Sequence, residues 1–166
     1  MEFVMKKDLS LEGIKYNAAA GNVMDVIQKM IDIANEKEVF VYEYINGTLL
    51  MIDPKMSAEE GLQLLHDIRA GKVNIEFYDT INDHMAGDAA NNMEKLAKDN
   101  DFVISNINGT IFRVSKNMSA KDILDTLAQV RKARKSRYEK ATQQLRAETA
   151  ERYVPSMTYQ NDGKVI

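Results

Sequence analysis

The sequence predicts an α+β fold made of two tandem pseudo-repeats, each with the order strand, helix, β-hairpin, helix, and ending in a long C-terminal helix. Three observations support this prediction. Residues 45–48 read Ile-Asn-Gly-Thr, and residues 107–110 read the same four residues 62 positions later. Both stretches lie between apolar, β-rich runs, and each hairpin leads into a helical pattern. The second helical pattern then continues without glycine or proline as far as Pro155.

The repeated stretch extends well beyond the four-residue turn. Residues 39–72 and 101–134 align without a gap and give twelve identities, whereas an unrelated pairing of that length would match at roughly two positions. We interpret this as an internal duplication. Residues 1–72 are the predicted first repeat, and residues 73–134 are the second, packed with the first as one globular body. Residues 135–153 extend the C-terminal helix, and residues 154–166 form a flexible tail. We expect the two hairpins to join side by side in one sheet around a local pseudo-twofold axis.

The composition excludes several classes of function. The chain has 166 residues, no cysteine and a formal net charge of −3. The absence of cysteine excludes disulfide frameworks, thiol nucleophiles and cysteine-ligated zinc. No run approaches eighteen apolar residues, and residues 1–10 lack the order of a signal peptide. These features predict a cytoplasmic protein without a membrane segment.

The charge is divided along the chain. Residues 121–153 hold nine basic and five acidic side chains, whereas residues 1–120 hold twelve basic and nineteen acidic ones. A basic C-terminal segment after an acidic body suggests an anionic partner for that segment. The partner could be nucleic acid or an acidic protein surface, including the body of another copy.

The first elements are predicted from short patterns. Residues 1–5 are apolar and could form an edge strand, and residues 9–20 could form one or two helical turns that end at Gly21. From Asn22 to about Asn35, apolar residues recur at helical spacing. Asn22 suits the N-cap of this helix, and Asp25 places a negative charge in its first turn.

Each hairpin contains Asn-Gly, which supplies the positive φ angles of a type I′ turn. A two-residue turn at Asn46 and Gly47 places Val41, Glu43 and Ile45 on one face, together with residues 48, 50 and 52, and we expect this face to be in the core. The opposite face carries Phe40, Tyr42, Tyr44 and Met51. This aromatic face is either covered by a helix or by the other repeat, or it is a partner-binding site. In the second hairpin the corresponding face is more polar, since it carries Asn106, Arg113 and Ser115.

The helices that follow the hairpins begin with capping signals. Ser57 with Glu60 forms a full capping box, and Ser119 with Asp122 resembles one. Between the hairpins, residues 73–78 alternate like a half-buried strand, and residues 86–97 supply a helix. Residues 75–78 resemble residues 1–4, so the complete repeat would begin with a strand. That assignment requires the second repeat to lose about eleven residues before its first helix, which loops tolerate.

The C-terminal helix is predicted to run from about Ala120 to Arg152, which is about 50 Å at 1.5 Å per residue. Tyr138, Ala141 and Leu145 form a thin apolar stripe that could mediate self-association into a homo-oligomer. Six basic side chains precede or overlap this stripe: Arg131, Lys132, Arg134, Lys135, Arg137 and Lys140. They could bind nucleic acid or an acidic protein surface. However, at 100° per residue they point around the whole helix, which is also typical of a solvated segment.

The sequence offers no convincing catalytic constellation. Asp79, Asp83 and His84 lie close together, but they lack a third fixed ligand for a metal, and Asp83 is well placed as a helix N-cap. His66 lies opposite the apolar stripe of its helix, so we expect it to be exposed. No metal and no cofactor is predicted. The leading hypothesis is a non-enzymatic binding protein, such as an inhibitor, adaptor or assembly factor, that acts through contacts with a protein partner. The alternative is a nucleic-acid-associated protein that uses the basic helix.

Overall fold

The computed structural model describes residues 10–18, 21–80 and 86–160, and the exposure of individual side chains as far as residue 150. The chain divides into two compact units, residues 1–130 and residues 131–166. The described part of the first unit contains two three-stranded sheets and the helices that cover them. The described part of the second unit is helical.

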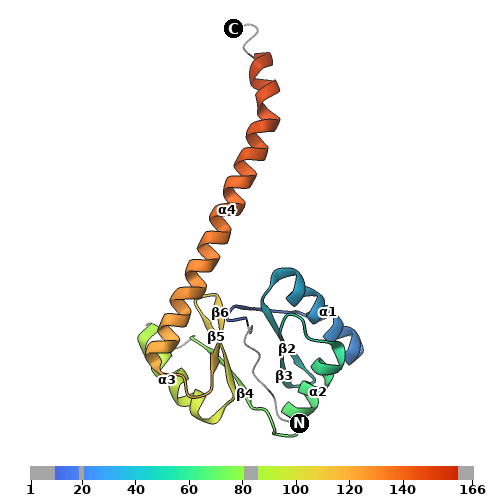
Figure 1. Ribbon diagram of the computed structural model, residues 1–166, viewed down its shortest axis with the longest axis vertical. Helices are drawn as coiled ribbons and strands as arrows, with labels where there is room; N and C mark the ends of the chain where they lie inside the picture. Colours follow the sequence, from blue (N-terminus) through green and yellow to red (C-terminus); the bar gives the residue numbers. More distant parts are fainter. Residues whose placement is uncertain (1–9, 19–20, 81–85, 161–166) are drawn as a thin grey trace. The chain divides into compact units, whose positions relative to one another are not determined.

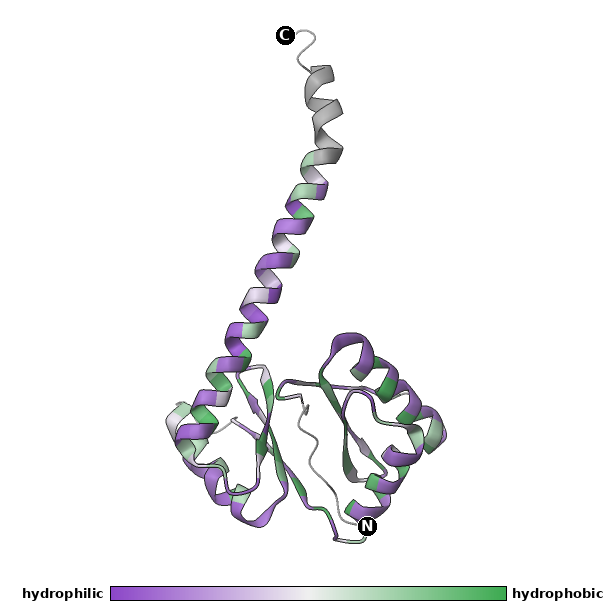
Figure 2. Cartoon of the chain, in the orientation of Figure 1, coloured by the Kyte–Doolittle hydropathy of each residue, from purple (hydrophilic) through white to green (hydrophobic). Residues whose placement is uncertain are grey.

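The first sheet and its helices come from residues 13–69. Along the chain they are β1 (Gly13–Lys15), α1 (Val23–Lys37), β2 (Phe40–Ile45), β3 (Thr48–Ile52) and α2 (Ala58–Arg69). Strand β2 is central, since it pairs in parallel with β1 and antiparallel with β3. Hydrophobic residues of α1 and α2 face β2 and β3, whereas polar residues face outward (Figure 2).

The second sheet repeats this arrangement. Its elements are β4 (Ile75–Asp79), α3 (Ala86–Asp99), β5 (Phe102–Ile107), β6 (Thr110–Ser115) and the beginning of α4 (Ala120–Gln160). Strand β5 pairs in parallel with β4 and antiparallel with β6 (Figure 1). The predicted α+β fold with a long C-terminal helix is therefore confirmed.

Corresponding elements in the two halves of the first unit are separated by a constant offset of 62 residues. Strand β5 has the bounds of β2 shifted by this number, and α2 and α4 begin 62 residues apart. Gly13 pairs with Phe40, and Ile75 pairs with Phe102. In each half, a residue of the first strand therefore pairs with the residue 27 positions later in the chain. With β1 as the counterpart of β4, no loss of eleven residues is needed. Residues 1–4, which were matched to residues 75–78 in the sequence, lie outside the described residues. A common origin of the two halves stays a prediction from the sequence.

The local signals at turns and helix ends are confirmed. Residues 46, 47, 108 and 109 all have positive φ, as two type I′ turns require. Asn22 Oδ1 accepts a hydrogen bond from the Asp25 N–H at 2.9 Å. Ser57 and Glu60 form the reciprocal capping box. At Ser119 the hydroxyl accepts from the Asp122 N–H at 3.1 Å.

The predicted helical turns in residues 9–20 are wrong, because β1 lies there. The Phe40 N–H donates to the Glu12 carbonyl at 3.0 Å, and the Tyr16 N–H donates to the Tyr42 carbonyl at 2.9 Å. Gly13 permits this pairing, since a Cβ atom at this position would overlap the Phe40 ring. Pairing with a distant strand therefore outweighs the local helical pattern.

The predicted single sheet is also wrong, because the hairpins belong to two separate sheets. The faces of the sheets that are not covered by helices pack together in an apolar cluster, whose buried members are Phe40, Tyr42, Leu49, Met51, Phe102 and Ile104. One isolated bridge, between Glu12 and Phe112, joins the segment before β1 to β6. The first unit is thus layered as helices, sheet, sheet, helices.

The C-terminal helix is longer than predicted. It ends at Gln160, whereas the sequence pattern placed its end near Arg152. Residues 154–160 of the predicted tail are therefore helical, and residues 161–166 lie outside the described residues.

Gly61 gives a test of the packing between the helices of the first half. A Cβ atom on Gly61 would lie 2.8 Å from Cγ2 of Ile27 and 3.0 Å from Cδ1 of Ile52. We expect Gly61→Ala to lower the free energy of unfolding by about 1–2 kcal/mol, because this overpacking exceeds the gain in helix propensity. Urea denaturation followed by circular dichroism would measure the change.

Gly87→Ala is the matched control, because Gly87 lies in α3 with no atom near the added methyl group. This substitution should leave stability unchanged or raise it by up to about 1 kcal/mol. Equal effects of the two substitutions would contradict the packing argument.

The offset of 62 places Ile123 at the position of Gly61 and Ala89 at the position of Ile27. In an Ile27→Ala background, which lacks the Cγ2 atom that the added methyl group would meet, Gly61→Ala should therefore cost less than it does in the wild type.

Candidate binding surfaces

The predicted aromatic surface of the first hairpin is mostly buried. Phe40 and Met51 are fully buried, and Tyr42 is 3% exposed, because all three contact the second sheet. These three side chains therefore belong to the interface between the two sheets and not to a partner-binding surface. Tyr44 alone remains accessible, with 47% of its surface exposed. Of the two interpretations of this face, the structure shows the one in which the other half of the unit covers it.

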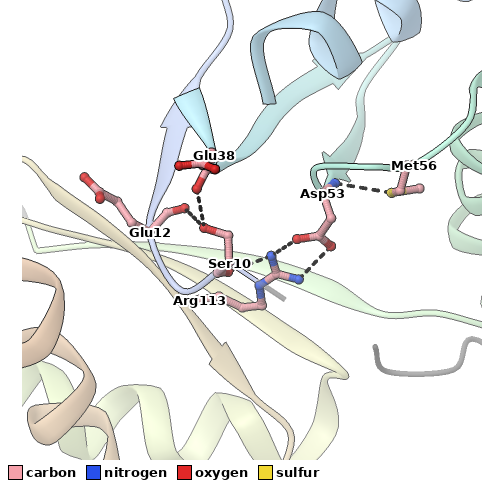
Figure 3. A network of polar contacts seen from close by, with 6 residues as sticks. All are labelled: Ser10, Glu12, Glu38, Asp53, Met56 and Arg113. Atoms are coloured by element: carbon pink, nitrogen blue, oxygen red, sulfur yellow. Dashed lines mark hydrogen bonds and ion pairs between the residues drawn. The ribbon is translucent and has the colours of Figure 1, made fainter. Parts of the chain in front are cut away.

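A buried ion pair joins the two sheets (Figure 3). Arg113 of β6 is 1% exposed and binds Asp53, which follows β3, through both terminal nitrogen atoms of its guanidinium. Its Nη1 donates to Oδ2 of Asp53 at 2.9 Å, and its Nη2 donates to Oδ1 of the same carboxylate and, at 2.8 Å, to the Ser10 carbonyl. The guanidinium therefore connects β6, the end of β3 and the segment before β1. Such bidentate contacts fix geometry as well as compensating charge.

Two aromatic rings lie beside the same guanidinium. The centre of the Phe40 ring is 4.8 Å from Cζ of Arg113, and that of Phe102 is 5.3 Å away. Both distances are within the range of cation–π interactions, which are stronger when water is excluded. Nε of Arg113 has no hydrogen-bond partner among the described residues. The rings and Asp53 therefore compensate for a charge that would otherwise be costly to bury.

The sequence contained a signal for this pair that was not used. The hairpin register places Arg113 on the face opposite the helix-covered face, and Asp53 continues the corresponding face of the first hairpin. A base and an acid on two faces that are otherwise apolar could have indicated that the faces meet. A second buried carboxylate, Glu43, lies on the face that the hairpin register predicted to be in the core. Glu43 is 8% exposed, and it accepts from the Ala18 N–H at 2.8 Å and the Tyr44 N–H at 2.7 Å.

A groove of about 400 Å³ lies where the first half of the unit meets β4. The β2–β3 turn, the end of α2 and residues 73–77 line it, together with Tyr44 and Asn100. Arg69 is held at this site, because its Nε donates to Oγ1 of Thr48 and its Nη2 donates to the Ile45 carbonyl, both at 3.2 Å. The groove therefore combines a fixed cation with aromatic, amide and carboxylate side chains.

Two tyrosines near the groove have altered acidity. Partial burial raises the pKa of Tyr44 above its usual value, and the nearby charge of Glu76 raises it further. Burial also raises the pKa of Tyr42, with smaller contributions from Tyr44 and Asp79. Both hydroxyls therefore stay protonated at neutral pH and can donate hydrogen bonds. The ring of Tyr42 also packs on Phe77, with 5.5 Å between the ring centres.

The second unit carries the predicted basic run and apolar stripe. The side chains of all residues from 131 to 141 are exposed, which includes the six predicted basic residues and Ala141. Tyr138 is 73% exposed and Leu145 is 59% exposed. Tyr138, Ala141 and Leu145 are spaced by three and four residues, so they lie on one face of the helix. This unit therefore presents apolar and cationic groups together.

The structure describes only one member of the group formed by Asp79, Asp83 and His84. Asp79 is an exposed residue at the end of β4, whereas Asp83 and His84 lie outside the described residues. His66 is exposed, as predicted. Among the described residues, no group of three or more potential ligands could hold a metal ion.

The chain matches no protein family model, no curated protein and no solved structure. Function therefore has to be inferred from the surfaces described above. Among the described residues, no helix has the length and apolar character that crossing a membrane requires.

The Arg113 and Asp53 pair makes a direct prediction about stability. Asp53→Asn should lower the free energy of unfolding by about 3–5 kcal/mol, because it leaves a buried guanidinium without a compensating charge. The double variant Asp53→Ser, Arg113→Met places at each position the residue found 62 positions away in the other half, namely Ser115 and Met51. Because it removes both charges, it should cost less than Asp53→Asn alone. Urea denaturation would measure both values, and a larger loss in the double variant would refute the argument.

Proposed function

We propose that this chain is a non-enzymatic binding protein, of the kind that acts as an inhibitor, adaptor or assembly factor, and that residues 131–150 are its main contact with a protein partner. The observation that carries the proposal is the exposure of Tyr138 and Leu145 on one face of this helix. Isolated helices gain little stability in water, and most helical stability in proteins comes from packing of an apolar face. A partner that covers Tyr138, Ala141 and Leu145 would supply that packing.

The charge of the helix indicates the chemistry of the partner. Residues 131–150 contain seven basic and two acidic side chains. Two such helices would repel each other, so direct pairing of identical helices is less favourable than pairing with an acidic surface. Residues 1–130 contain thirteen basic and twenty-one acidic side chains. The acidic first unit of a second copy is therefore one partner of suitable charge, which would make the protein a homo-oligomer.

Sedimentation of the full-length protein at low and high salt would test whether the protein forms this homo-oligomer. If the helix of one copy binds the acidic unit of another, self-association should weaken by at least tenfold between about 0.05 and 0.5 M salt, because exposed charge pairs are screened. The double variant Tyr138→Ser, Leu145→Ser should weaken it further by removing the apolar anchors. Ala133→Ser, Ala147→Ser is the matched control, because these two side chains are also exposed but lie off the face of the same helix that carries Tyr138 and Leu145.

Each result bears on a different part of the proposal. A monomer at all salt concentrations would exclude the homo-oligomer and leave a different acidic protein as the partner. Association that strengthens with salt would favour direct pairing of the apolar stripes, since salt screens their repulsion. If the Tyr138 and Leu145 variant associates as strongly as the wild type, the helix is not the contact.

Nucleic acid is the second candidate partner, and the six exposed basic side chains within ten residues favour it. Such a cluster would bind phosphates without sequence preference. The affinity for a 20-base-pair DNA or RNA duplex should then fall steeply with salt, and Arg134→Glu with Lys135→Glu should reduce both the affinity and the salt slope. Fluorescence anisotropy would measure this. Binding that is absent or insensitive to salt would exclude this candidate.

A further inference from the structure

The two sheets of the first unit meet along two seams that differ. At the first seam the segment before β1 is bonded to β6: the Arg113 N–H donates to the Leu11 carbonyl at 2.8 Å, and Glu12 and Phe112 form an antiparallel bridge. The offset of 62 places Val73 and Asn74, the residues before β4, at the positions of Leu11 and Glu12. At this second seam β3 has β2 as its only paired strand within the described residues. The groove of about 400 Å³ lies at this second seam.

The second seam is open because α2 holds the segment that would close it. The N–H groups of Lys72 and Val73 both donate to the Asp67 carbonyl, at 2.8 and 3.3 Å. Val73 is 3% exposed and packs into the core of the first half. The segment therefore stays against the end of α2 and does not form a bridge to β3. As a result, β3 and β4 are both edge strands in the described part of the chain.

Backbone groups of β4 face the groove. The Thr80 N–H donates to the Asn106 carbonyl at 3.3 Å, and the Asn74 carbonyl accepts from the Phe102 N–H at 3.3 Å. In a parallel pair, alternate residues direct their backbone groups to the neighbouring strand, so even-numbered residues of β4 face β5. Ile75, Phe77 and Asp79 therefore direct their N–H and C=O groups toward the open edge. Such an edge is a template for an added strand.

We propose that this groove binds an extended segment of a partner protein with alternating apolar and basic side chains, which adds as a strand to the open edge of β4. Tyr44 and Phe77 supply aromatic contacts for an apolar side chain, and Glu76 supplies a carboxylate for a basic one. Arg69 also lines the groove, but its Nε and Nη2 atoms already donate hydrogen bonds to Thr48 and to the Ile45 carbonyl. The first unit as a whole is acidic. A second copy fits less well, because pairing two β4 strands would bring their acidic residues together.

A labelled peptide of four lysines and three valines in alternation, mixed with the full-length protein, would test the proposal by fluorescence anisotropy. Wild-type protein should bind this probe, whereas the same peptide with N-methylated backbone amides should bind at least tenfold more weakly, because it cannot pair as a strand. Tyr44→Ser and Glu76→Lys should each weaken binding by about tenfold. Glu36→Lys is the matched control, since it makes the same charge change at an exposed position of α1. It should change binding by less than about twofold.

Amide chemical shifts would locate the probe, with the largest changes expected at Ile75 and Phe77. Equal binding of the N-methylated peptide would overturn the proposal, and so would equal effects of Glu36→Lys and Glu76→Lys. The first result would mean that the probe does not pair as a strand, and the second would mean that its binding follows the net charge of the unit. The variant Tyr138→Ser, Leu145→Ser should bind the probe normally, so failure of this proposal is distinguishable from failure of the helix as a binding element.

Discussion

The architecture of the first unit depends on the contact between its two sheets, and Arg113 is at the centre of that contact. An arginine that is 1% exposed is unfavourable unless its charge and its donors are matched. Asp53 supplies the charge, Ser10 supplies a carbonyl, and the rings of Phe40 and Phe102 cover the guanidinium. Because these partners come from both sheets and from the segment before β1, the charge of the arginine is compensated only when all three are assembled. The ion pair therefore contributes specificity to an interface whose remaining members are mostly apolar.

This contact changes how the surface of the protein is interpreted. The aromatic side chains of the first hairpin resemble a partner-binding surface in the sequence, yet three of the four are used internally. Tyr44 is the exception, because the inner faces of the two sheets do not cover the turn end of β2. Its 47% exposure and the polar groove beside it make this a part of the first unit where an aromatic side chain and charged groups remain accessible together. The acidic character of the first unit and the basic character of residues 131–150 then indicate partners of opposite charge for the two surfaces.

Local features of the fold could be predicted from the sequence, whereas contacts between distant segments could not. Asn46 and Gly47 determine the register of their hairpin through backbone geometry alone, and Ser57 and Glu60 begin a helix in the same local way. Strand β1 was missed because its three residues are defined by pairing with β2 and by the fit of Gly13 under Phe40. The two-sheet arrangement was missed because the first hairpin has a second apolar face, and a pattern of period two does not show what covers it. The groove could not be predicted, because it depends on hydrogen bonds between residues 72–73 and Asp67.

The two proposed binding elements arise where the two halves stop corresponding. Gly71 has φ of 76°, which ends α2 and turns the chain toward Val73, whereas Ala133 stands 62 positions later within α4. A glycine is favoured for the first conformation, and alanine is the residue best suited to continue a helix. The first difference holds residues 72–73 against α2 and leaves β3 and β4 open. The second carries the helix through the exposed basic residues to Tyr138 and Leu145. The difference at this pair of positions therefore separates a helix that ends before β4 from one that continues into the exposed basic segment, while the hairpins that form the core remain alike.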